Sequence, residues 1–125
     1  MSDAMQTVWQ ELRDKAGPYP REAYDFVRAG LTHTVQMIHG ETPGDSEDDS
    51  RHISGKQLCL GLRDYATHRY GRLARTVLGR WGVHSTEDFG RIVYAMVDAG
   101  LMRTAEGDSF EEFRGVFDFD EGFAD

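Results

Sequence analysis

Five glycines mark the ends of successive helical patterns in this sequence. Each follows a stretch in which apolar residues recur at the three- and four-residue spacing of an amphipathic helix. Glycine is common just past a helix end because it adopts the left-handed backbone conformation freely. The five are Gly17, Gly40, Gly71, Gly82 and Gly100. They predict a mostly α chain of five helices, over residues 3–16, 20–39, 54–70, 72–81 and 85–99.

The third and fifth predicted helices have clear starts. Ser54 is an N-cap with Gln57 three positions later, which forms a capping box, and Ser85 is a second N-cap with Asp88 in the same relation. Between them, the helix over 72–81 is short and ends in a turn at Gly82. Two helices joined by such a turn have the spacing of a helix-turn-helix.

The stretch from 85 to 113 predicts the fold class. Its apolar stripe, Phe89, Ile92, Val93, Met96 and Val97, is typical of a helix packed on a core. After Gly100, residues 101–104 read as a strand, 106–108 as a turn and 109–113 as a second strand. We therefore expect an α+β fold in which residues 53–113 form a winged-helix-like core with a small C-terminal β-hairpin.

Charge is uneven along the chain, which has a net charge of −8. Residues 1–52 hold five lysines and arginines against ten acids, 53–105 hold eight against four, and 106–125 hold one against eight. The acidic ends either compensate the basic middle within the monomer, which we favour, or leave that middle to face an acidic partner.

The surface candidates fall into two groups. The exposed face expected for the helix over 85–99 carries three acids and one arginine, which does not suit a DNA-reading helix. A second group of five arginines lies within 18 residues of the two preceding helices. The candidate interaction residues are Glu87, Asp88, Arg91, Tyr94 and Asp98, followed by Arg63, Arg69, Arg72, Arg75 and Arg80.

Two segments lie outside the predicted core. Residues 41–52 contain a run of acids without apolar residues and read as a solvated loop. Residues 114–125 alternate aromatic and acidic side chains, which favours an edge strand with its phenylalanines inward. The alternative is a free acidic–aromatic peptide that docks on a partner. With a helical pair over 1–40, the chain of 125 residues reads as a single domain.

Known chemical motifs are incomplete. Gly55 and Lys56 lack the remaining residues of a phosphate loop, and the acids from Asp45 to Asp49 lack the glycine and glutamate of a calcium-binding EF-hand. Cys59 lies on an apolar helix face, where a thiol packs rather than reacts. The histidines include none of the short pairs expected of a zinc site; they are His33, His39, His52, His68 and His84. We expect no catalytic, cofactor or metal site.

Several segments together resemble a family of bacterial proteins found mainly in the Planctomycetes–Verrucomicrobia group. The resemblance covers nearly the whole chain and is carried by residues 19–27, 52–58, 88–94, 100–102 and 117–119. No activity, cofactor or catalytic residue comes with it. It implies only a cytoplasmic bacterial protein of about this length.

The function we expect from the sequence is therefore a non-enzymatic, cytoplasmic protein-interaction or scaffold module. No apolar run is long enough to cross a membrane, residues 1–5 lack the basic and apolar regions of a secretory signal, and the single cysteine fits a reducing compartment. An unknown protein partner is expected, with the oligomeric state left open. The alternative is a winged-helix nucleic-acid-binding regulator.

Overall fold

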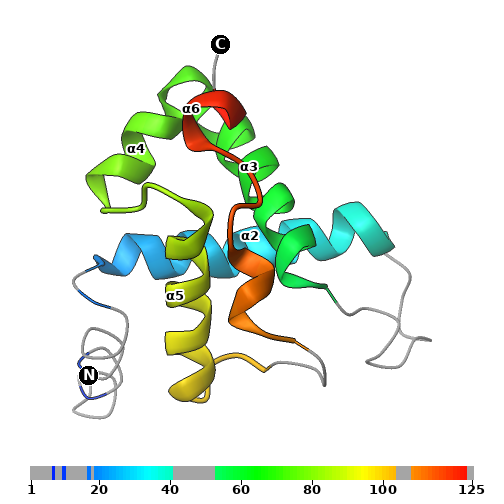
Figure 1. Cartoon of the computed structure of the whole chain (residues 1–125), viewed down its shortest axis with the longest axis vertical. Coiled ribbons are helices and arrows are strands. Elements are labelled where there is room, and N and C mark those ends of the chain that lie inside the picture. The colour runs from blue at the N-terminus through cyan, green and yellow to red at the C-terminus, as the bar shows by residue number, and fades with distance from the viewer. Residues whose placement is uncertain are drawn as a thin grey trace.

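The computed structural model describes residues 19–40, 53–103 and 108–123, together with Thr7, Gln10 and Gly17. Within these ranges the chain is helical (Figure 1) and contains no strand. The elements are α2 (Arg21–His39), α3 (Gly55–Tyr70), the 3-10 turn η2 (Gly71–Leu73), α4 (Ala74–Arg80), α5 (Thr86–Asp98), the 3-10 turn η3 (Phe110–Phe113) and α6 (Phe119–Gly122). The helix expected over 3–16 falls almost wholly outside the described residues, as does the loop over 41–52. None of the described helices is long and apolar enough to span a bilayer.

The glycine pattern correctly predicts the ends of α2, α3, α4 and α5, while the end expected before Gly17 lies outside the described residues. All five glycines have positive φ angles, from 55° at Gly71 to 109° at Gly17. The capping box at the start of α3 is also confirmed, because the Gln57 backbone N–H donates to Ser54 Oγ at 3.1 Å and the Ser54 N–H donates to Gln57 Oε1 at 2.9 Å. These local signals act within one turn of chain, so they do not depend on the tertiary fold.

The predicted β-hairpin is wrong, and with it the winged-helix-like α+β class. Residues 101–103 form no strand, and the second expected strand is the 3-10 turn η3; the turn between them lies outside the described residues. Phe110 and Phe113, three residues apart, both pack against Tyr94 of α5, with ring centroids 6.4 and 6.1 Å away. A strand would send them to opposite faces, whereas a 3-10 turn places them on one face.

The helix α2 passes across α3 and α5 and contacts both, and α3 also contacts α4 (Figure 1). The core they enclose contains large, fully buried side chains from four helices. These are Tyr24, Val27, Leu62, Leu78, Phe89, Ile92 and Met96. The crossing of α2 with α3 is close, because Gly30 faces Leu62 and Gly61 faces Thr34 without a Cβ between them.

The C-terminal tail packs on the core but not as a strand. Its phenylalanines point inward as expected, since Phe119 is buried against Phe89 while Phe117 and Phe123 are partly buried beside it. Instead of a strand the tail forms α6, whose first N–H groups donate to the Asp118 carboxylate. Figure 1 shows α6 lying over α3 and α4.

Candidate binding groove and polar clusters

One of the acids predicted for the exposed face of α5, Asp88, is used inside the fold. Asp88 is buried and accepts hydrogen bonds from the Tyr19 hydroxyl, from His84 N at 2.8 Å, from Ser85 N at 3.2 Å and from Arg91 Nη1 at 2.6 Å. The expectation that Asp88 lies on the exposed face is therefore wrong. Its carboxylate joins the segment before α2 to the start of α5.

The contacts of this cluster shift the pKa values of Asp88 and Tyr19. Burial alone would raise the pKa of Asp88, but the hydrogen bonds from Tyr19 and from the backbone, together with the Arg91 charge, outweigh it and hold that pKa below its usual value. Burial and the hydrogen bond to Asp88 raise the pKa of Tyr19 to about 12. In this cluster the neutral Tyr19 phenol therefore donates a hydrogen bond to the ionised Asp88 carboxylate, and each polar group has a hydrogen-bond partner.

The other α5 candidates differ in exposure. Glu87 accepts from the Gly115 backbone N–H at 3.1 Å and so ties down the loop after η3. Tyr94 packs edge-on against the η3 phenylalanines. Arg91 and Asp98 are exposed, with Arg91 paired to Asp88. Whether these side chains bind a partner stays a prediction.

Much of the arginine cluster is engaged within the chain. Arg63 lies over the Phe117 ring, Arg69 over Tyr65 and Tyr70, and Arg75 over Phe119. Arg75 also forms an ion pair with Asp120 at 3.2 Å. Arg72 and Arg80 are exposed, on η2 and α4. The basic middle is thus partly compensated by the acidic–aromatic tail.

A carboxylate already lies at the start of α3. This is the place where Gly55 and Lys56 only partly match a phosphate loop. The Gly55 backbone N–H donates to Glu112 Oε1 at 3.0 Å. A carboxylate at a helix N-terminus satisfies the free N–H groups and the helix dipole. Glu112 therefore takes the position that a phosphate would need.

Cys59 is fully buried, and burial raises the pKa of its thiol to about 12. We expect the native protein at pH 8 to leave a thiol reagent such as DTNB unconsumed over the time in which the urea-unfolded chain releases one equivalent of thionitrobenzoate. Rapid reaction of the folded protein would show that this face of α3 opens.

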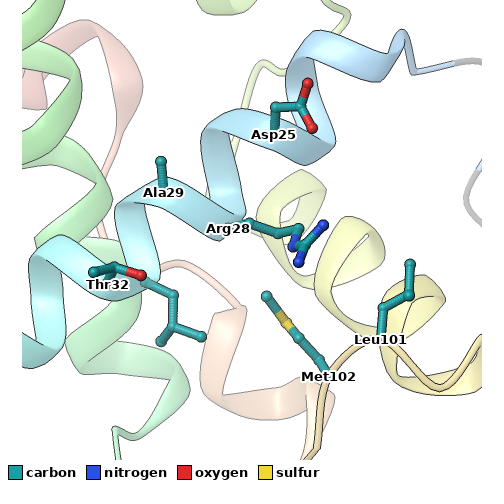
Figure 2. A pocket seen from close by; sticks show the side chains of 7 residues that line it. Asp25, Arg28, Ala29, Thr32, Leu101 and Met102 are labelled. Atoms are coloured by element: carbon teal, nitrogen blue, oxygen red, sulfur yellow. The ribbon is translucent and has the colours of Figure 1, made fainter.

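An open groove of about 490 Å³ lies between α2 and the segment that follows α5 (Figure 2). It is lined by Asp25, Arg28, Ala29, Leu31, Thr32, Leu101 and Met102. Figure 2 shows the Arg28 side chain extending from α2 toward Leu101 and Met102. Leu101 remains 38% exposed, although leucine side chains usually pack. The groove thus combines apolar surface with one guanidinium. Sequence reasoning missed it, because Leu31 read as core and Leu101 as strand.

A polar cluster joins α2 to α3 on another part of the surface. His33 Nε2 lies 2.7 Å from Asp64 Oδ2, and His68 Nδ1 lies 3.5 Å from the same oxygen. This cluster contains none of the short histidine or cysteine pairs that predict a metal site from sequence. Asp64 and His68, four residues apart on one helix, were the available signal.

Comparisons of this chain with protein-family profiles, with curated proteins and with solved structures find no match. The resemblance to the Planctomycetes–Verrucomicrobia family accordingly stays a prediction.

Proposed function

We propose that this protein is a non-catalytic interaction module that binds a short segment of a partner protein in the groove between α2 and residues 101–102. The partner would place an apolar side chain against Leu101 and Met102 and an adjacent carboxylate against Arg28. The observation that carries the proposal is the juxtaposition of a half-exposed leucine and a guanidinium in one groove. Such an arrangement can bind an apolar anchor side chain of the partner and orient that partner through the charge of Arg28.

The shape of the groove favours a segment of polypeptide over a small molecule. Its volume of about 490 Å³ is within the size range of ligand sites, but it is wide open to solvent. An open site of this kind buries one side of a ligand only, which suits a chain that continues beyond it. Met102 lines the groove and can adjust to different apolar side chains, because an unbranched thioether side chain has several accessible rotamers.

Catalysis has less support because two side chains that could react, Cys59 and Asp88, are engaged within the fold. The Cys59 thiol is buried, and the Asp88 carboxylate is saturated by internal hydrogen bonds. A nucleic-acid role is also weaker than a protein partner. Neither flank of the expected wing forms a strand in the described residues, and Arg63, Arg69 and Arg75 stack on rings of this chain.

Selection of peptides from a displayed random library on the immobilised full-length protein tests the proposal. We expect enriched sequences to share an apolar residue next to an aspartate or glutamate. In fluorescence anisotropy, Arg28→Glu should weaken binding of such a peptide by about tenfold or more, because it replaces a charge-assisted hydrogen bond with repulsion. Leu101→Asp should weaken it similarly.

Lys56→Glu is the matched control, because it makes the same charge change at an exposed position of α3, a helix that supplies no groove residue. Its affinity should stay within about twofold of the parent. The proposal fails if no peptide is enriched, or if Arg28→Glu and Lys56→Glu reduce affinity equally.

A further inference from the structure

Three side chains that can donate to a metal ion converge where α2 and α3 cross. His33 comes from α2, and Asp64 and His68 come from successive turns of α3. One donor atom from each lies within 4.8 Å of the other two. Asp64 Oδ2 is the common neighbour, at 2.7 Å from His33 Nε2 and 3.5 Å from His68 Nδ1.

The fold holds this cluster from two sides. Next to His33, Thr34 packs directly on Gly61, so the backbones of α2 and α3 approach closely. The Tyr65 ring lies against the His33 imidazole, with centroids 5.3 Å apart, which limits rotation of that ring. His33 and Asp64 are therefore positioned by packing and by the helix crossing as well as by their own hydrogen bond.

We propose that His33, Asp64 and His68 form a binding site for one divalent transition-metal ion, with Zn²⁺ as the best fit. Two imidazoles and one carboxylate, with water in the remaining position, are a donor set that zinc accepts in tetrahedral sites. Bonds of about 2.0–2.1 Å at tetrahedral angles place neighbouring donor atoms about 3.3 Å apart. The pair from Asp64 and His68 already has this spacing, at 3.5 Å. The distance between His33 Nε2 and Asp64 Oδ2, now 2.7 Å, increases slightly when the ion binds.

The exposure of the donors suits an ion that enters from solvent. The side chains of His33, Asp64 and His68 are 27%, 41% and 70% exposed. The ion displaces two weaker contacts, the hydrogen bond between His33 and Asp64 and the approach of His68 Nδ1 to the Asp64 carbonyl oxygen at 3.0 Å. Because it would link α2 to α3, binding should stabilise the fold.

Isothermal titration of the full-length protein, without an added histidine tag, with ZnCl₂ at pH 7.5 tests the site. We expect one saturable site per chain and a rise in melting temperature. His68→Gln and Asp64→Asn should each weaken binding by at least about tenfold, since even loss of a residue that merely supports a ligand has an effect of this size. Co²⁺ should give the visible bands of tetrahedral nitrogen and oxygen coordination.

His84→Gln is the control, because it removes an exposed histidine outside the cluster and should leave the affinity unchanged. In the unmutated protein, one equivalent of Zn²⁺ should shift the imidazole NMR signals of His33 and His68 but not those of His84. That measurement needs no variant to fold. The proposal is overturned by the absence of saturable binding, by zinc affinity that survives both cluster substitutions, or by unshifted His33 and His68 signals.

Discussion

Gly61→Ala is expected to destabilise the protein by at least about 2 kcal/mol, measured by urea unfolding followed by circular dichroism. A Cβ at this position would lie 2.6 Å from Thr34 Cγ2 and 2.7 Å from Thr34 Cβ, and closer still to Oγ1. Rotation of the threonine side chain cannot relieve this overlap, because its Cβ is fixed by the backbone of α2. The two helices must move apart, which opens the core that they share.

Alanine substitutions at two other glycines should change stability less than Gly61→Ala or in the opposite direction. Gly30→Ala should cost less, because the new Cβ would meet the end of the Leu62 side chain, which can shift within the core. Gly79→Ala should have the opposite sign and stabilise by about 0.5–1 kcal/mol. Its Cβ would be no closer than 3.7 Å to His84, an ordinary contact, in the last turn of α4. If Gly61→Ala instead stabilises the protein as Gly79→Ala does, the close crossing of α2 and α3 is wrong.

Helix positions were predictable because their signals are local. The capping box at Ser54 and the glycine that ends each helix depend on hydrogen bonds within a few residues. The helices α2, α3, α4 and α5 begin and end within a residue or two of the predicted ones, apart from the 3-10 turn that precedes α4, whereas α6 was predicted as a strand. The hydrophobic stripe of α5 also identified its buried face, since Phe89, Ile92, Val93 and Met96 are buried.

The hairpin could not be judged from local signals. The residues from Ser109 to Phe113 alternate weakly and contain two phenylalanines, which are common in strands. Their conformation is decided by tertiary packing instead. Gly90 leaves room on α5 for both rings, because a Cβ there would lie 2.7 Å from Phe110 and 2.9 Å from Phe113. The Thr86 hydroxyl also donates to the Phe113 carbonyl at 2.6 Å.

The candidate sites were partly visible in the sequence. The spacing of Asp64 and His68 shows that they share a helix face, but His33 joins them only through the register of α2 on α3. That register depends on which glycines and small residues meet at the crossing. The role of Asp88 was half predicted. It is the third residue after the Ser85 cap as expected, but its partner Tyr19 lies 69 residues earlier in the chain.

Asp88→Ala is expected to lower the free energy of unfolding by about 3 kcal/mol or more, measured by the same urea titration. The substitution leaves the Tyr19 hydroxyl and the N–H groups of His84 and Ser85 without their acceptor. It also removes the partner of Arg91 and the N3 member of the capping box at the start of α5. Asp88→Asn should cost less, because one amide oxygen can still accept from the backbone.

The pH dependence of the unfolding free energy distinguishes the contribution of the Asp88 charge from that of its hydrogen-bonding geometry. Because the folded-state pKa of Asp88 is lowered, its ionised form stabilises the fold at pH values above the unfolded pKa of about 4, and this contribution is lost as the pH falls through the lower folded pKa. The difference in stability between the unmutated protein and Asp88→Asn should therefore narrow below about pH 4.

Asp98→Ala is the control for both measurements, since Asp98 is an exposed acid at the other end of the same helix. It should change stability by less than about 0.5 kcal/mol, in the stabilising direction, because a carboxylate is unfavourable at a helix C-terminus. Equal losses for Asp88→Ala and Asp98→Ala would mean that Asp88 acts as an ordinary surface acid. The cluster with Tyr19 and Arg91 would then not secure the start of α5.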